Sequence, residues 1–192
     1  MTTAEQEAQT VKHLSWTELE AGLEAIQQSP RDHGTLELIV VRPGTNRRLV
    51  LEACELSPAL GVHGDDWASR AHVQLPDGTV NLKAQVTMMN SRVIALLAQA
   101  KERWALAGDQ LIVDLDLSDD ILRPDQRLAL GTAILEITNK PHRGCAKFAE
   151  RFGADALKFV NSEVGRHLHL RGVYARIVQA GAARVGDAIV KC

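Results

Sequence analysis

The chain has 192 residues, of which 45% are apolar and 24% charged, so it can bury a sizeable core within one domain of generous size. Its net charge of -2 gives no global reason to expect a nucleic acid or an anionic membrane as a partner. The three cysteines are widely spaced, which argues against a disulfide framework, and no apolar run approaches the roughly 18 residues of a membrane span. We therefore expect a cytoplasmic protein without nucleic-acid or membrane partners.

The N-terminal segment divides into a tail and a helix. Residues 1–12 are polar and acidic without an apolar core region, so we expect a flexible tail and no secretory signal. Ser15 is followed three residues later by Glu18, which is the spacing of a capping box, and apolar residues then recur at helical intervals as far as Ile26. A single domain is expected over residues 13–192.

A hairpin is expected next. Residues 36–41 form an apolar run typical of a strand, Pro43 to Asn46 has turn chemistry, and residues 49–56 form the predicted return strand. Cys54 falls within that return strand, where it is interpreted as a small buried residue. The segment from Gly61 to Trp67 is predicted to be a tight, irregular loop because it contains two glycines three positions apart.

The rest of the chain contains more strands than helices. We predict a helix from Asn90 or Ser91 through Ala100 and a short helix over Ala146–Phe152, followed by two further helical segments. The strands are predicted at 80–88, 111–115, 127–130, 133–138, 173–178 and 188–191, with turns at Gly131-Thr132, Gly181 and Gly186-Asp187. This order favours a β-rich α+β fold, with a β-barrel or strongly bent sheet and peripheral helices.

The turn before the predicted helix at 146–152 is the strongest candidate site. Its sequence, from Pro141 to Phe148, places Cys145 beside His142, Arg143 and Lys147. Nearby cations and a helix N-terminus both favour the thiolate, which is the nucleophilic and metal-binding form of cysteine. From residue 141 onward the chain has nine Lys or Arg and four Asp or Glu, a balance of +5, whereas the remainder has 13 against 20, or −7. An anionic small molecule is therefore better matched to this part of the chain than to the rest.

Four interpretations of Cys145 remain open from the residues alone. It can be a structural cysteine, a metal or cofactor ligand, a nucleophile activated by His142, or part of a zinc site with His142, His167 and His169. The zinc interpretation is weakened because no second cysteine pair supports it. Hydrolase and nucleotide-binding motifs are absent from the sequence, which also weakens the nucleophile interpretation.

Two other segments carry candidate binding residues. The first is the loop after residue 60, in which Asp65 and His63 could reach a pocket rim, although an ordinary turn has the same composition. The second is a predicted strand-to-helix junction, where free N–H groups can bind an anion and a simple helix cap is the alternative. The polar residues of that junction are Gln85, Thr87, Asn90 and Arg92.

Three pieces of the sequence, taken in order, resemble the MOSC domain, the module found at the C-terminus of molybdenum cofactor sulfurases and in small stand-alone bacterial proteins. Residues 61–67 resemble an early Gly-x-x-Gly-Asp loop of that family. Residues 108–117 resemble its Gly-Glu-Asn-Leu segment, and residues 128–147 resemble the strand-turn-strand that leads to a single cysteine with a lysine two positions later. The resemblance extends from Gly61 to Lys191.

The resemblance implies a barrel-like core and identifies Cys145 as the family's cysteine, whose thiolate ligates the metal in members that bind molybdenum cofactor. It also implies oxygen-atom transfer, such as the reduction of N-hydroxylated compounds, or alternatively a sulfur carrier with a persulfide on Cys145. A non-catalytic binding domain that retains only the fold is the third possibility. Soft sulfur donors suit molybdenum, and the phosphate of the cofactor requires cations and N–H groups. We expect Arg143, Lys147, Asp65 and the polar residues of the 85–92 junction to contribute these contacts.

The sequence departs from the family pattern in several respects. The Gly-Glu-Asn-Leu segment becomes Gly108-Asp109-Gln110-Leu111, and the arginine content close to Cys145 in the sequence is modest. The chain contains no pyridoxal phosphate, flavin or iron–sulfur module. An external electron donor, or a sulfur donor or acceptor protein, is therefore the expected partner, together with a small-molecule substrate.

Overall fold

The structure is a computed structural model that describes residues 12–70 and 73–192. The predicted tail therefore lies outside the described residues, apart from Lys12, whose ammonium lies 3.1 Å from the Glu18 carboxylate. The described part of the chain has no helix that is both long and apolar enough to cross a bilayer.

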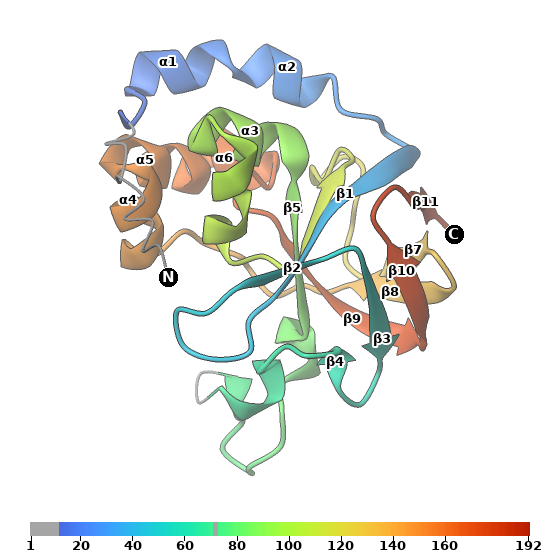
Figure 1. Ribbon diagram of the computed structural model, residues 1–192. Coiled ribbons are helices and arrows are strands. Elements are labelled where there is room, and N and C mark those ends of the chain that lie inside the picture. The colour runs from blue at the N-terminus through green and yellow to red at the C-terminus, as the bar shows by residue number, and fades with distance from the viewer. Residues whose placement is uncertain (1–11, 71–72) are drawn as a thin grey trace, which may run out of the picture.

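A closed barrel of seven strands organises the molecule, as predicted (Figure 1). The strands follow one another around the barrel in the order β1, β11, β7, β8, β9, β5 and β6, and β6 pairs with β1 to close it. Neighbouring strands are antiparallel except for the parallel pair β5 and β6. The bounds are β1 (His33–Val41), β5 (Val86–Asn90), β6 (Leu111–Asp114), β7 (Arg127–Leu130), β8 (Ala133–Ile137), β9 (Val173–Gln179) and β11 (Ala188–Lys191).

The predicted return strand is two strands, which corrects the expectation for residues 49–56. Strand β2 (Leu49–Leu51) pairs with β1, whereas β3 (Ala53–Ser57) leaves the barrel and forms a small sheet with β4 (Gly61–Val62) and β10 (Gly181–Arg184). Strand β10 contains the position expected to be a turn at Gly181. The carbonyl group of Thr132 and the backbone nitrogen of Ala133 lie so close to Gly181 that a side chain there would collide with them, which explains why glycine begins this strand. Short strands of this kind carry too weak an alternation to be separated by sequence pattern.

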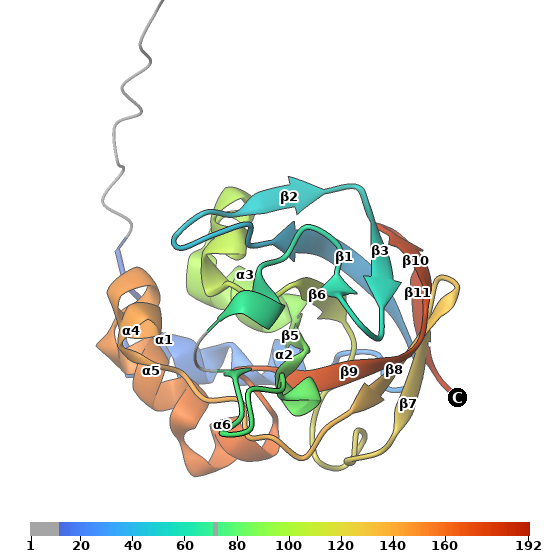
Figure 2. The ribbon, with the colours of Figure 1, turned by 90° about the horizontal axis from the view of Figure 1, so that it is seen from below.

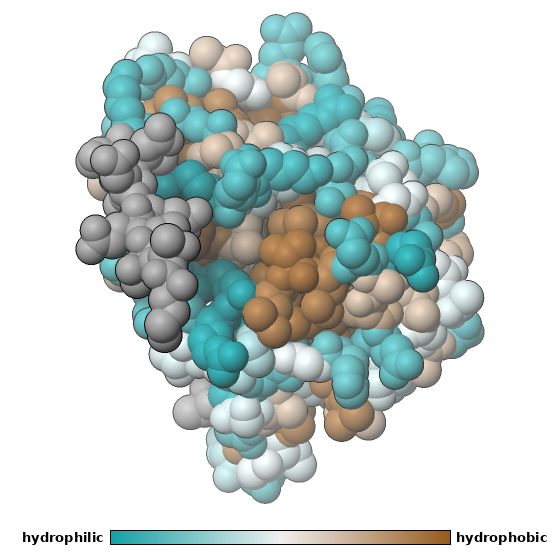
Figure 3. Space-filling view, in the orientation of Figure 1, coloured by the Kyte–Doolittle hydropathy of each residue, from teal (hydrophilic) through white to brown (hydrophobic). Residues whose placement is uncertain are grey.

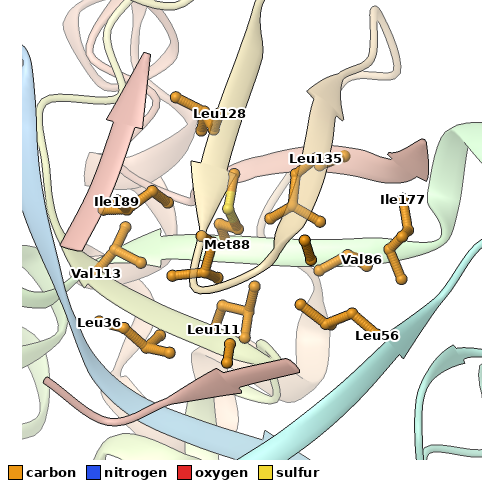
Figure 4. Close-up of a cluster of buried hydrophobic side chains, with 14 of the residues drawn as sticks. Leu36, Leu56, Val86, Met88, Leu111, Val113, Leu128, Leu135, Ile177 and Ile189 are labelled. Atoms are coloured by element: carbon orange, nitrogen blue, oxygen red, sulfur yellow. The ribbon is translucent and has the colours of Figure 1, made fainter. Parts of the chain in front are cut away.

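The barrel interior is filled by aliphatic side chains from every strand of the barrel (Figure 4). Leu36, Met88, Leu111 and Leu135 are fully buried there, together with Leu56 from β3. With so few aromatic residues in the chain, leucine, valine, isoleucine and methionine supply the packing. The interior is therefore a filled core, and any binding site must lie on the outside or at a rim.

Helices cover one side of the barrel (Figures 1 and 2). A second buried cluster joins them to the sheet, with Phe148, Phe152 and Phe159 as its aromatic members. The capping box predicted at Ser15 and Glu18 is formed, and Asn90 caps α3 as predicted. The helices are α1 (Trp16–Ala21), α2 (Leu23–Gln27), α3 (Ser91–Ala98), α4 (Ala146–Phe152), α5 (Ala154–Asn161) and α6 (Glu163–His167), with 3-10 helices η1 (Trp67–Ser69), η3 (Leu82–Ala84) and η4 (Lys101–Ala107).

The strand expected over residues 80–88 is shorter than predicted. Residues 82–84 form the 3-10 helix η3, because Asn81 caps the turn at Lys83, and β5 follows it.

Strand β2 has a strand partner on one side only, and Leu49 and Val50 are 48% and 55% exposed there. The apolar patch at the centre of the face in Figure 3 lies over this strand.

Candidate functional site: a cationic cleft at Cys145

Cys145 lies at the start of α4, after an irregular segment that follows β8. It is the N-cap residue of the helix, but its side chain makes no capping hydrogen bond, and the residue is exposed. Phe148 and Phe152 are buried on the inner face of α4 and fix the helix against the core. The thiol is therefore presented at the surface by an anchored element.

Asn161 of α5 holds the residue that precedes the cysteine. The backbone N–H of Gly144 donates to Asn161 Oδ1 at 3.0 Å, and Asn161 Nδ2 donates to the Gly144 carbonyl at 3.2 Å. A Cβ on residue 144 would lie 2.7 Å from the Leu157 side chain, so the backbone approaches α5 more closely than a larger residue allows. The two hydrogen bonds and this close packing fix the position of the backbone directly before Cys145.

A cleft of about 990 Å³ opens beside Cys145. Its walls come mainly from three parts of the chain that are distant in sequence: residues 42–48 after β1, residues 66–70 around η1 together with Val73, and residues 142–151 around α4. Tyr174 and Arg171 contribute from β9 and the turn before it. The cleft is large enough for an organic cofactor.

Cations dominate the lining of this cleft. Seven arginines and one lysine line it, against one carboxylate, that of Asp66. Three of the arginines have a carboxylate within 4.0 Å: Arg42 with Asp65, Arg70 with Asp66, and Arg171 with Asp109. Within the described parts of the chain the other five have none, and these are Arg47, Arg48, Arg143, Lys147 and Arg151. This excess of positive charge favours a ligand that carries several negative charges.

Arg42 is held in the cleft wall by a buried ion pair. Its guanidinium donates to both oxygens of Asp65, at 2.8 and 3.0 Å, and to the Gly108 carbonyl at 2.8 Å. The Asp65 side chain is fully buried, and the amide nitrogen of Gln110, Nε2, donates to Asp65 Oδ1 at 3.4 Å. Asp65 and Gln110 thus position Arg42 from behind the wall.

Arg48 and Arg151 approach each other above Gly108. A Cβ placed on Gly108 would be 3.7 Å from Arg48 Nη2 and 4.0 Å from Arg151 Nη1. Burial, and then the charges of Arg151, Arg42 and Arg70, lower the pKa of Arg48 from its ordinary value. Arg48 Nε is buried without a hydrogen-bond partner in the described residues. Such a cluster of like charges is suited to bind an anion.

A cluster of buried polar side chains lies at the base of the cleft. Arg171 Nη1 donates to Asp109 Oδ2 at 2.6 Å, and His142 Nδ1 lies 3.7 Å from Asp109 Oδ1. The His142 ring packs on Tyr174 with ring centroids 4.5 Å apart. Burial, and then the positive charges of Arg171 and Arg42, lower the pKa of His142 well below its ordinary value, so the imidazole is neutral. Burial raises the pKa of Asp109, an effect opposed by the charge of Arg171.

The structure brings together part of the set of residues predicted to contact a ligand. Cys145, Arg143, Lys147 and Thr87 all line the cleft. Asp65 lies behind its wall, and Gln85 is fully buried, where it donates to the Pro58 carbonyl and accepts from the Ile177 N–H. These two side chains support the site from outside the cleft.

Asn90 and Arg92 lie away from the cleft, which corrects the expectation of an anion site at this junction. The Asn90 side chain accepts from the N–H groups of Arg92 and Val93, the groups that an anion would need. The Arg92 guanidinium is paired with both oxygens of Asp114 and with the Ala25 carbonyl. The helix cap, which was the simpler alternative, is what the chain forms here.

The zinc site considered for His142, Cys145, His167 and His169 is not formed. Nowhere in residues 12–70 and 73–192 do three or more His, Cys, Asp or Glu side chains gather in a way that could hold a metal ion. His167 and His169 lie near the acidic turn after β6, within 4 Å of Asp119.

Cys54 is buried as predicted, and burial raises the pKa of its thiol to about 11.

Most cations of the cleft were not anticipated from the sequence. Arg42, Arg48 and Arg70 precede Cys145 by more than 70 positions, and only folding brings them to it. The segment from Gly108 to Leu111 is one of the family-like pieces of the sequence, and it supplies the Gly108 carbonyl, the Asp109 carboxylate and the Gln110 amide. That segment and the Gly61–Trp67 loop, whose Asp65 holds Arg42, are the sequence signals that point to this wall.

The MOSC domain family model matches residues 62–190. The chain belongs to the MOSC domain family. This membership confirms the resemblance seen in the sequence, and the matched region includes Cys145, Asp109 and Tyr174. The family is associated with binding of the molybdenum cofactor. No curated protein matches the chain in a comparison of sequences.

Solved structures with the same fold support this assignment. The YuaD protein of Bacillus subtilis superposes with a TM-score of 0.60 at 17% identity, covering 82% of this chain and 94% of YuaD. YiiM of Geobacillus stearothermophilus gives a TM-score of 0.55 at 16% identity, with coverages of 83% and 75%. YiiM of Escherichia coli gives 0.52 at 14%, with coverages of 82% and 69%. At these identities the likeness establishes the fold.

The residues of the cleft fit the chemistry of the molybdenum cofactor. An exposed thiol is a soft donor suited to molybdenum, and the unpaired guanidiniums match the phosphate of the pterin group. The buried, unpartnered Nε of Arg48 is the observation that points to a missing anionic partner.

Proposed function

We propose that this protein binds the molybdenum cofactor in the cationic cleft, with the Cys145 thiolate as a ligand of the metal, and reduces N-hydroxylated compounds with electrons from an external donor. The observation that carries the proposal is the exposed Cys145 at the edge of a cleft with five cations that lack a carboxylate partner. Membership of the MOSC family supports the choice of cofactor.

The cations of the cleft form two groups, to which we assign different roles in binding the cofactor. Arg42, Arg48 and Arg151, gathered around Gly108, would hold the phosphate through charge-assisted hydrogen bonds. Arg143 and Lys147 flank Cys145 in sequence and would balance negative charge close to the metal. The cofactor supplies the site at which an oxygen atom is accepted and electrons are transferred.

Two protons must also be delivered when a nitrogen–oxygen bond is reduced by two electrons, because the oxygen leaves as water. The uncharged polar groups of this chain that line the cleft include those of Thr87, His142 and Tyr174. Burial raises the pKa of Tyr174, so its phenol is neutral and can donate a hydrogen bond. The chain itself therefore has groups suited to orient a protic substrate.

Molybdenum content tests the role of Cys145. The wild-type chain and the variants Cys145→Ser and Cys192→Ser are purified from cells that synthesise the cofactor, and bound molybdenum is measured by elemental analysis. Cys192 is the matched control because it is also an exposed thiol. We expect molybdenum in the wild type and in Cys192→Ser, and a large loss in Cys145→Ser. Equal molybdenum in all three proteins would contradict the ligand assignment.

Activity is measured separately on the loaded protein. An N-hydroxylated amidine is supplied with a chemically reduced viologen as the electron donor, and formation of the amidine is followed. Turnover that is lost in Cys145→Ser supports the proposed reaction. Loaded protein that shows no turnover with this substrate class would refute the reaction while leaving cofactor binding intact.

A sulfur carrier is the second candidate, and the exposure of the Cys145 thiol favours it. In this role the thiolate accepts a sulfur atom from a desulfurase and holds it as a persulfide. Mass spectrometry after incubation with a desulfurase and cysteine should then show the gain of one sulfur atom on the peptide that contains Cys145. No gain, under conditions that load a known carrier, counts against this function. A chain that binds no metal and gains no sulfur would be a non-catalytic binding domain.

A further inference from the structure

The base of the cleft contains two buried polar atoms that face each other without a hydrogen bond. Asp109 Oδ1 and His142 Nδ1 are both buried and without a partner in the described residues, and they are 3.7 Å apart. Buried polar atoms in folded proteins are nearly always hydrogen-bonded, so a pair of unpaired atoms at this distance requires an explanation. A small movement of the imidazole ring would join them.

The surroundings determine which atom carries the proton. Burial raises the pKa of Asp109, and Arg171 Nη1, which donates to its other oxygen at 2.6 Å, opposes that rise; we take Asp109 as the carboxylate because of this ion pair. A carboxylate accepts hydrogen bonds only, so the proton between the two atoms belongs on His142 Nδ1. Tyr174 packs against the ring and limits its rotation. The neutral imidazole then has its unprotonated nitrogen at Nε2.

His142 Nε2 is the ring nitrogen that remains accessible. The His142 side chain is 7% exposed, and the residue lines both the Cys145 cleft and a smaller cavity of about 270 Å³. Among the described residues Nε2 has no hydrogen-bond partner, yet it is not one of the fully buried, unpaired atoms. An accessible, unprotonated imidazole nitrogen is a strong hydrogen-bond acceptor.

We propose that Asp109 fixes His142 in the Nδ1–H tautomer, so that Nε2 serves as a hydrogen-bond acceptor for an N–H or O–H group of the molecule bound in the cleft. The tautomer is a property of the protein alone. The identification of that molecule as an N-hydroxylated substrate rests on the proposed function. In that case the substrate's N–OH or N–H donates to Nε2, and this contact orients the nitrogen–oxygen bond. No covalent bond to His142 forms or breaks.

The first experiment determines the tautomer without any cofactor or substrate. Two-bond nitrogen–proton correlation spectra are recorded on protein with ¹⁵N-labelled histidine, and the His142 signals are identified by their absence in His142→Gln. We expect Nδ1 protonated and Nε2 unprotonated. The Nε2–H tautomer in the wild type would overturn the proposal.

Replacement of the carboxylate adds a directional test. In Asp109→Asn, the side-chain carbonyl stays with Arg171 and the amide NH₂ turns toward His142, so Nδ1 must accept and the proton moves to Nε2. We expect the tautomer to switch. A folded Asp109→Asn protein that retains the Nδ1–H tautomer contradicts the role of Asp109. If this variant does not fold, the wild-type spectrum still decides the question.

The second experiment tests the contact with the substrate on cofactor-loaded protein. His142→Phe retains a ring against Tyr174 but has no acceptor, whereas His142→Gln retains an acceptor near the position of Nε2. We expect kcat/KM for the N-hydroxylated amidine to fall about tenfold in His142→Phe, the effect of one hydrogen bond, and to be largely rescued in His142→Gln. Molybdenum content and the unfolding midpoint are measured for each protein.

The exposed His63, which does not line the cleft, provides the control variant His63→Gln, which should behave as the wild type. Equal kcat/KM in His142→Phe and the wild type would refute the contact. Loaded wild type without turnover would refute the proposed reaction only, and the tautomer would still be decided by the spectra.

Discussion

The side-chain amide of Asn161 makes two hydrogen bonds to the backbone of Gly144, the residue directly before Cys145. One is accepted from the Gly144 N–H and the other is donated to its carbonyl, at 3.0 and 3.2 Å. The cysteine proposed as the metal ligand is thereby located by a residue of a different helix. Replacing groups that orient a metal ligand from behind typically lowers metal affinity by about 10- to 100-fold.

Loss of this amide should weaken metal binding without removing the ligand. We expect Asn161→Ala to lower retention of molybdenum about tenfold or more during dialysis, because the turn that contains Cys145 loses both bonds. Asn161→Asp retains the acceptor for the Gly144 N–H and should be intermediate. Elemental analysis before and after dialysis measures the effect. Retention equal to that of the wild type in Asn161→Ala would show that the turn is held by other contacts.

The three cysteines should differ in reactivity toward a thiol reagent. Burial raises the pKa of the Cys54 thiol to about 11, so at pH 8 it is both protonated and inaccessible. We expect iodoacetamide to modify Cys145 and Cys192 in the native protein and to modify Cys54 only after unfolding. Peptide mass spectrometry measures the modification at each site. Early modification of Cys54 would mean that strand β3 opens readily.

The buried ion pair between Arg42 and Asp65 should make a measurable contribution to stability. Its removal by Asp65→Ala leaves the Arg42 guanidinium, whose side chain is 14% exposed, without its carboxylate. We expect the free energy of unfolding to fall by about 3 kcal/mol, as for other buried pairs that lose one partner. Chemical denaturation provides the measurement. Asp32→Ala is the control, since this exposed carboxylate pairs with Lys191 at the surface and its removal should leave the free energy of unfolding nearly unchanged.

His142 should make the protein sensitive to acid. Its folded-state pKa is held well below the ordinary value of 6.5 by burial and by Arg171 and Arg42, whereas in the unfolded chain it is free to protonate. The unfolded state therefore binds more protons as the pH falls below about 6.5, and stability decreases from there downward. We expect His142→Gln to reduce the loss of stability between pH 6.5 and 5, as measured by thermal unfolding. An unchanged slope would mean that other groups cause the acid sensitivity.

The cluster above Gly108 should bind phosphate-bearing anions even without the cofactor. Arg48 and Arg151 each have a guanidinium nitrogen within 4.0 Å of the position that a Cβ on Gly108 would take, and neither has a carboxylate partner in the described residues. We expect pyrophosphate to bind the wild type in calorimetry at low salt and to bind Arg48→Ala at least tenfold more weakly. Arg184→Ala, an exposed cation outside the cleft lining, is the control. Equal affinity in all three proteins would place the anion elsewhere.

The sequence by itself determined the class of the fold and the family, and it indicated Cys145 as the candidate ligand. Alternating apolar runs between turn residues indicated a β-rich chain, and the short helix before Gly153 was predicted with its observed bounds. Three motifs in order indicated the family and assigned Cys145. These features depend on local spacing, which a sequence displays directly.

Only the tertiary structure decided what surrounds Cys145. The arginine content near this cysteine in the sequence is modest, yet Arg42, Arg48 and Arg70 reach it because β1 and η1 lie at the same side of the barrel. Conversely, the sequence around Asn90 and Arg92 is suited to bind an anion. In the fold, however, the Asn90 side chain caps α3 and the Arg92 guanidinium pairs with Asp114. A side chain's local chemistry is visible in the sequence, whereas whether its donors remain free depends on partners that are distant along the chain and are brought together only by closure of the barrel.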